Sequence, residues 1–160
     1  MKQPEKTCCF TGHREIPSED LAPLKKRLRK EIVSLIHNGV LYFGTGGARG
    51  FDMLAAQTIL KLKKRYPQIR LIMVLPCAEH TKFWKKRDIA NYQKILSKTD
   101  KVVYISKDYY PGCMDKRNRH LVNYSGYCLC YMTRFSGGTC NTVTYAYSKG
   151  LEIINCAKKR

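Results

Sequence analysis

The segment Gly44-Thr45-Gly46-Gly47-Ala48-Arg49-Gly50-Phe51-Asp52 is the strongest indication of the fold in this sequence. A short apolar run, residues 40–44, leads into it, and apolar residues at helical spacing follow it from Phe51 until Pro67. A glycine-rich turn between a strand and a helix lets backbone N–H groups approach an anion closely, and the helix N-terminus adds partial positive charge. The segment therefore predicts a strand, an anion-binding turn and a helix.

The residues of this turn have separate predicted roles. Gly46, Gly47 and Gly50 allow the backbone to approach a ligand, and Arg49 can add a bidentate phosphate contact. Asp52 can cap the helix or accept a ribose hydroxyl. The alternative is a tight turn with a capping aspartate and no ligand. The segment contains neither the Gly-Lys-Ser/Thr of a Walker A sequence nor a G-x-G-x-x-G dinucleotide fingerprint.

Outward from this unit, apolar runs and amphipathic stretches alternate along the whole chain without a linker or repeat. The pattern predicts strands at 7–11, 40–44, 69–75, 102–105, 127–132 and 152–156. It predicts helices at 51–66, 83–98, 114–124 and 138–149. A further helix before Asn38-Gly39 has one buried face, made of Leu21, Leu24, Leu28, Ile32 and Leu35. We therefore expect residues 1–160 to form a single α/β domain of the Rossmann-like type, with a mainly parallel open sheet and helices on both faces. Strand order stays open.

Such sheets bind ligands beyond the carboxyl ends of their strands, so the turns that follow the strands are the candidate site. Two more turns have this placement. The first contains Gly12, His13 and Arg14, and Arg14 is the anion candidate because its charge does not depend on pH near neutrality. His13 belongs to the candidate site, with a solvent-exposed loop residue as the alternative. The second contains Ser136, Gly137, Gly138 and Thr139 and opens the last helix.

A fourth segment, residues 111–120, gathers cations and an amide at the start of a helix. Arg117 and Asn118 can contact phosphate and ribose or base. Arg119 is expected to face solvent. The four segments should converge on one edge of the sheet, which makes each a stronger candidate than it is alone.

Thirty Lys and Arg residues against twelve Asp and Glu give a formal net charge of +18. This charge attracts polyanions over long range, so nucleic acid and phosphate-bearing ligands are the expected partners. Part of the excess falls in helical stretches at 25–30, 61–65 and 85–87, where a solvated outer face is the ordinary role.

The eight cysteines, at positions 8, 9, 77, 113, 128, 130, 140 and 156, show no C-x-x-C pair with a matching partner. We expect them to be reduced, with several buried in strands, and we expect no metal site. No apolar stretch approaches the roughly 20 residues that cross a bilayer, and the N-terminus lacks the apolar core of a secretory signal. These features predict a cytoplasmic protein without membrane contact.

Four segments carry a resemblance to a known family: CFTGHRE, GTGGARGFDMLAA, PGCMDKRNRHLV and GGTCNTVTYA. Together they resemble the SLOG superfamily, the Rossmann-like group that contains the DNA-processing protein DprA and the LOG phosphoribohydrolases, and in particular its YpsA-like branch. The resemblance covers nearly the whole chain and implies a nucleotide or nucleotide-derived ligand, such as an ADP-ribose or NAD-related molecule, and no required cofactor. The implied positions are Gly12, Arg14, Gly46, Gly47, Arg49, Gly50, Arg117, Asn118, Gly137, Gly138 and Thr139.

Two alternatives follow from the same resemblance. LOG enzymes cleave an N-glycosidic bond with the glutamate of a P-G-G-x-G-T-x-x-E signature, whereas no acidic residue occurs here from Ser136 through Gly150. A glycosidase would need another carboxylate, with Asp52, Glu79 and Asp115 as candidates. The DprA branch binds single-stranded DNA, which the positive charge also suits. No catalytic residue is assigned, and a homo-oligomer is left open.

Overall fold

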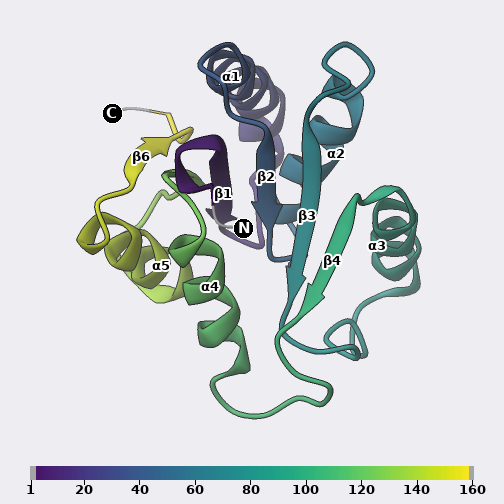
Figure 1. Cartoon of the computed structure of the whole chain (residues 1–160). Helices are drawn as coiled ribbons and strands as arrows, with labels where there is room; N and C mark the ends of the chain where they lie inside the picture. Colours follow the sequence, from purple (N-terminus) through teal and green to yellow (C-terminus); the bar gives the residue numbers. More distant parts are fainter. Residues whose placement is uncertain (1–2, 159–160) are drawn as a thin grey trace.

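Strands and helices alternate along residues 3–158, the part of the chain that the computed structural model describes (Figure 1). After a short 3-10 helix at Pro4–Lys6, the strands are β1 (Thr7–Gly12), β2 (Tyr42–Thr45), β3 (Arg70–Leu75), β4 (Lys101–Tyr104), β5 (Tyr127–Tyr131) and β6 (Glu152–Asn155). The helices are α1 (Ser18–His37), α2 (Phe51–Leu62), α3 (Lys86–Lys98), α4 (Cys113–Asn123) and α5 (Gly137–Ser148).

All six strands form one parallel sheet in the order β4-β3-β2-β1-β5-β6. Cys9 on β1 pairs with Gly44 of β2 on one side and with Cys128 of β5 on the other. From β1 the chain proceeds outward to β4, crosses back to β5 and then continues outward on the opposite side. The predicted Rossmann-like fold is confirmed, and the structure adds the strand order.

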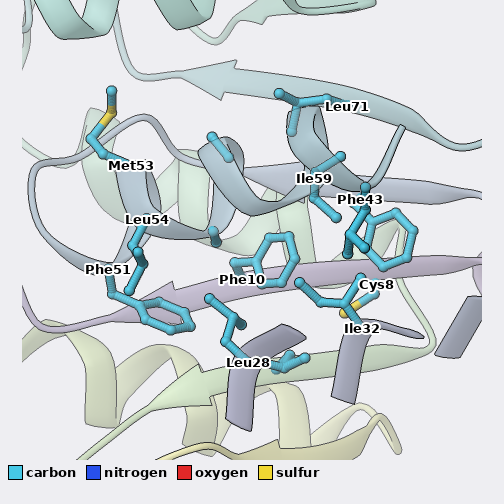
Figure 2. Packing of buried hydrophobic residues seen from close by; sticks show 14 of the residues in the cluster. Cys8, Phe10, Leu28, Ile32, Phe43, Phe51, Met53, Leu54, Ile59 and Leu71 are labelled. Atoms are coloured by element: carbon cyan, nitrogen blue, oxygen red, sulfur yellow. The ribbon is translucent and has the colours of Figure 1, made fainter. Parts of the chain in front are cut away.

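The larger core lies between the sheet and the helices α1, α2 and α3. Phe10 of β1 is buried at its centre, with its ring 6.0 Å from that of Phe43 on β2. Figure 2 shows Leu28 and Ile32 of α1 beside Phe10, together with side chains from α2. These apolar positions recur every three or four residues along α1, which is why the helix packs against the sheet through one face.

A smaller core covers the other face of the sheet, beneath α4 and α5. Cys9, Cys128 and Cys130 point to this side, while their neighbours Cys8 and Leu129 point to the larger core. This alternation follows from the two-residue period of a strand. All eight cysteines are free thiols and all except Cys140 are buried. Cys8, Cys9, Cys128 and Cys130 lie in strands, which confirms the predicted burial of several cysteines there.

Two predictions from the sequence are wrong. Leu21 is exposed instead of facing the core, and it lies in the first turn of α1, before the buried positions that begin at Leu24. The helix expected from Phe83 begins at Lys86, since residues 78–83 form turns instead of helix. Within residues 3–158, no helix combines the length and apolar character needed to cross a membrane.

Candidate functional site

A cleft of about 460 Å³ lies at the carboxyl edge of the sheet, at the ends of β1 and β5. The connections from these two neighbouring strands leave toward opposite sides of the sheet, which opens a crevice where α/β folds bind ligands. The structure brings eight predicted residues together as its lining. They are Gly12, His13, Arg14, Asp52, Arg117, Asn118, Gly138 and Thr139.

Arg117 on α4 is the most deeply placed cation of the cleft, with only 6% of its surface exposed. Its guanidinium donates hydrogen bonds to the carbonyl oxygen of Gly46 and, at 2.7 Å, to Oδ1 of Asn118. Burial lowers the pKa of Arg117, and the nearby carboxylate of Asp52 opposes that shift. The remaining donors of a guanidinium held in this way can serve an anion in the cleft.

Asp52, in the first turn of α2, is buried and joins the turn to the helix. Its Oδ2 accepts a hydrogen bond of 3.1 Å from the backbone N–H of Ala48. Burial raises the pKa of Asp52 to about 6, against the opposing influence of Arg117. Of the two roles expected for Asp52, it does not cap α2 from the N-cap position, because Gly50 occupies that position and the carboxylate accepts its hydrogen bond from the preceding turn.

His13 is buried, so the alternative of a solvent-exposed loop residue is wrong. Its Nε2 accepts a hydrogen bond of 2.9 Å from the backbone N–H of Thr133, and its carbonyl oxygen accepts another from the N–H of Phe51. Burial, reinforced by the positive charge of Arg134, lowers the pKa of His13. The neutral ring therefore links the turn after β1 to the turn after β5.

Three glycines of the cleft region are required by close packing. A Cβ on Gly12 would lie 2.5 Å from the ring of Phe51, and one on Gly46 would lie 2.6 Å from Nη1 of Arg117. Gly50 has a φ of +77° and leaves no room for a Cβ against the backbone of Arg14. These glycines leave room for the Phe51 ring, the Arg117 guanidinium and the Arg14 backbone, which is a structural requirement separate from any contact with a ligand.

The turn after β5 remains open. Gly138 has no neighbouring atom within 4 Å of the position of a Cβ, and it lines the cleft with Thr139. Ser136 and Gly137 are exposed at the start of α5, and no side chain forms a capping hydrogen bond there. The first N–H groups of a helix lack partners within the helix, so this N-terminus presents free donors beside the cleft.

Arg49 lies outside the cleft, with its guanidinium 5.6 Å from the centre of the Trp84 ring, and it lines two neighbouring cavities. Gly46, Gly47 and Gly50 lie behind the cleft and do not line it. Of the other carboxylates proposed for a glycosidase, Asp115 pairs with Arg119 at 3.1 Å on the surface, and Glu79 is exposed in a loop.

Two charged residues that the sequence patterns did not indicate, Glu15 and Arg134, also line the cleft. Arg134 lies just before the last glycine-rich turn, and Glu15 directly follows Arg14. Their positions beside the predicted turns are the feature of the sequence that could have identified them as cleft residues. With Arg14 and Arg117, Arg134 makes three arginines around one cavity, an arrangement that attracts phosphate.

Two solved structures share this fold. The DNA processing protein A (DprA) of Streptococcus pneumoniae superposes with a TM-score of 0.68 at 16% identity, over 92% of this chain and 48% of that one. The second structure is that of DprA from Helicobacter pylori and concerns its single-stranded DNA binding mode. It superposes with a TM-score of 0.69 at 17% identity, over 98% of this chain and 67% of that one. At these identities the likeness shows the fold alone.

The chain is also similar to curated proteins whose names state no activity. A UPF0398 protein of Halalkalibacterium halodurans is 34% identical over 64% of this chain and 55% of its own length. The uncharacterized SPbeta prophage-derived protein YoqJ of Bacillus subtilis is 29% identical over 77% of this chain and 80% of its own length. The chain spans 55% to 61% of the length of the first three UPF0398 proteins that it matches. The YpsA family model, described as the YspA SLOG family, matches residues 9–152, and the chain belongs to this family.

Proposed function

We propose that this protein binds a nucleotide or nucleotide-derived ligand in the cleft between the ends of β1 and β5. The observation that carries the proposal is the convergence of Arg14, Arg117 and Arg134 on a cavity that also contains the open turn at Gly138. Guanidinium groups and a free helix N-terminus are the groups that proteins use to hold phosphate. Asn118 and Asp52 add polar groups for a sugar or a base.

The cleft has a suitable size and polarity for such a ligand. Its volume of about 460 Å³ falls within the roughly 300–1,000 Å³ that is usual for small-molecule sites. Apolar contact comes from Phe10 and Leu121 at its base, and a few convergent polar groups surround them. A buried arginine that is already oriented by Gly46 binds a ligand without first losing side-chain freedom.

Single-stranded DNA is the second candidate ligand. The net charge is +18, and the fold matches that of the Helicobacter pylori DprA, a single-stranded DNA binder. A strand would lie along the basic edge of the sheet with its phosphates over the same arginines. Binding of this kind depends on counterion release, and salt dependence therefore separates it from binding of a small nucleotide.

Glycosidic cleavage has one supporting observation. Among Asp52, Glu79 and Asp115, Asp52 lines the cleft and has a pKa raised to about 6. A carboxyl group of that pKa suits proton transfer near neutral pH. Release of free base from nucleoside monophosphates, abolished in Asp52→Asn, would identify an enzyme, and absence of release in the wild type would leave a binding protein.

The proposal is tested by native mass spectrometry of gently purified protein, which detects a retained nucleotide and the assembly size, followed by calorimetry with nucleotides. Gly138→Val should lower nucleotide affinity at least tenfold, because the new side chain enters the cleft where nothing in the fold opposes it. Lys26→Ala, on the exposed face of α1, is the control and should bind as the wild type does. Unchanged affinity in both variants would place the ligand elsewhere.

A further inference from the structure

A second cavity of about 200 Å³ adjoins the cleft on the side of the loop after β3. Arg14, Ala48 and Arg117 line both cavities. The two guanidinium groups therefore stand at the junction between the two spaces. A phosphate bound by them would have the cleft on one side and this second cavity on the other.

The second cavity has an aromatic and cationic wall. Trp84 and Phe83 line it, and the guanidinium of Arg49 lies over the Trp84 ring at 5.6 Å. Phe83 is 92% exposed, which is unusual for a phenylalanine and leaves its ring available to a ligand. Aromatic rings combined with arginine are the surfaces on which nucleobases stack.

The wall is held in place by the fold. The two ring nitrogens of His80 lie 3.2 Å from the carbonyl oxygen of Cys77 and 3.3 Å from that of Gly47, which places the ring between the loop and the glycine-rich turn, with its N–H available to one of the two oxygens. The His80 and Trp84 rings meet edge to face at 5.5 Å, and Trp84 meets Tyr92 of α3 at the same distance. Trp84 is thereby oriented before any ligand arrives, which lowers the entropy cost of stacking.

We propose that the cavity at Trp84 receives the second nucleobase of a ligand in which two nucleosides are joined through phosphate. This inference rests on the proposed function. The first nucleoside occupies the cleft, the phosphates lie on Arg14 and Arg117, and the second base stacks against Trp84 and Phe83. A small dinucleotide with a pyrophosphate bridge and two successive nucleotides of a single strand share this chemistry.

Trp84 is the one tryptophan of the sequence, so its fluorescence reports on this cavity directly. The probes are ADP, diadenosine diphosphate (two adenosines joined by pyrophosphate) and a single-stranded deoxyadenosine dinucleotide. We expect a two-nucleoside probe to bind about tenfold more tightly than ADP and to quench Trp84, whereas ADP leaves the fluorescence nearly unchanged. A gain for the pyrophosphate-linked probe assigns a small dinucleotide, and a gain for the deoxy dinucleotide assigns a strand.

Substitutions in the second cavity test whether the tighter binding of a two-nucleoside probe arises there. Trp84→Leu and Phe83→Ala should each reduce the affinity of the two-nucleoside probe relative to ADP, while the affinity for ADP itself stays unchanged. Trp84→Phe should retain most of the tighter binding of the two-nucleoside probe. Phe83→Ala keeps the test valid if Trp84→Leu folds poorly, because the Phe83 side chain is almost fully exposed. Tyr147→Ala, an exposed aromatic on α5, is the control and should change nothing.

Two failures have different meanings. If ADP binds, but neither two-nucleoside probe binds more tightly or quenches Trp84, the inference is overturned and the proposed function stands. If no probe binds the wild type, the proposed function fails together with the inference.

Discussion

Arg117 on α4 donates a hydrogen bond to the carbonyl oxygen of Gly46, 71 residues earlier in the chain, and its guanidinium occupies the space that a Cβ on Gly46 would need. This contact ties the helix after β4 to the turn after β2. It also fixes the cation that faces the cleft. The Arg117 side chain therefore contributes both to the stability of the fold and to the proposed ligand site.

The first prediction concerns two glycines that differ in surroundings. Gly46→Ala should lower the free energy of unfolding by about 1–3 kcal/mol, because the methyl group displaces Arg117 from a buried hydrogen bond. Gly138→Ala, where a Cβ meets open space, should leave stability within about 0.5 kcal/mol of the wild type. Urea unfolding measures both, and equal losses would contradict the assigned role of the Arg117 contact.

The arginines of the cleft should separate into two kinds. Arg117→Ala should weaken nucleotide binding about tenfold or more and also destabilise the fold, since it removes a charge-assisted contact and leaves the Gly46 carbonyl without its donor. Arg134→Ala should weaken binding with little change in the unfolding midpoint, because Arg134 is exposed. Calorimetry together with thermal unfolding distinguishes these outcomes. A stability loss in Arg134→Ala as large as that in Arg117→Ala would refute the distinction.

Asp52 predicts a pH dependence of stability. Its pKa is raised from 3.8 to about 6 in the folded state, so the folded protein binds this proton more tightly than the unfolded chain does. The stabilisation is complete below the unfolded value and is lost as the pH rises through about 6. Relative to Asp52→Asn, the wild type should lose about 2–3 kcal/mol of unfolding free energy between about pH 4 and pH 7. Parallel pH profiles for the two proteins would show that Asp52 titrates normally.

The salt dependence of binding should distinguish a small ligand from a strand. A single strand that neutralises several phosphates loses affinity steeply, with a log-log slope near −0.7 per phosphate. We expect nucleotide binding to change little with salt, and single-stranded DNA to bind weakly with a steep slope and little loss in Gly138→Val. DNA binding that persists near physiological salt and disappears in Gly138→Val or Arg117→Ala would favour the strand. Fluorescence anisotropy with labelled oligonucleotides provides the measurement.

The fold class and the edge of the sheet where the cleft lies follow from local patterns in the sequence. Apolar periodicity is a local property that reflects which side of each helix or strand is buried, so residues such as Leu28 and Ile32 identify their helix without knowledge of its neighbours. Parallel strands place all their carboxyl ends at one edge. The turns at Gly12, Gly46 and Gly138 could therefore be predicted to lie at one edge before their distances were known.

Which of these residues face the cleft depends on how distant segments pack together. The strand order put β5 beside β1, which brought Arg134 toward Arg14 and Arg117, while Arg49 turned away to pack on Trp84. His13 became a buried link because Thr133, 120 residues later, supplies its donor. Such outcomes depend on side chains that meet across different crossovers, and no local pattern encodes which distant segment fills the space beside a given residue.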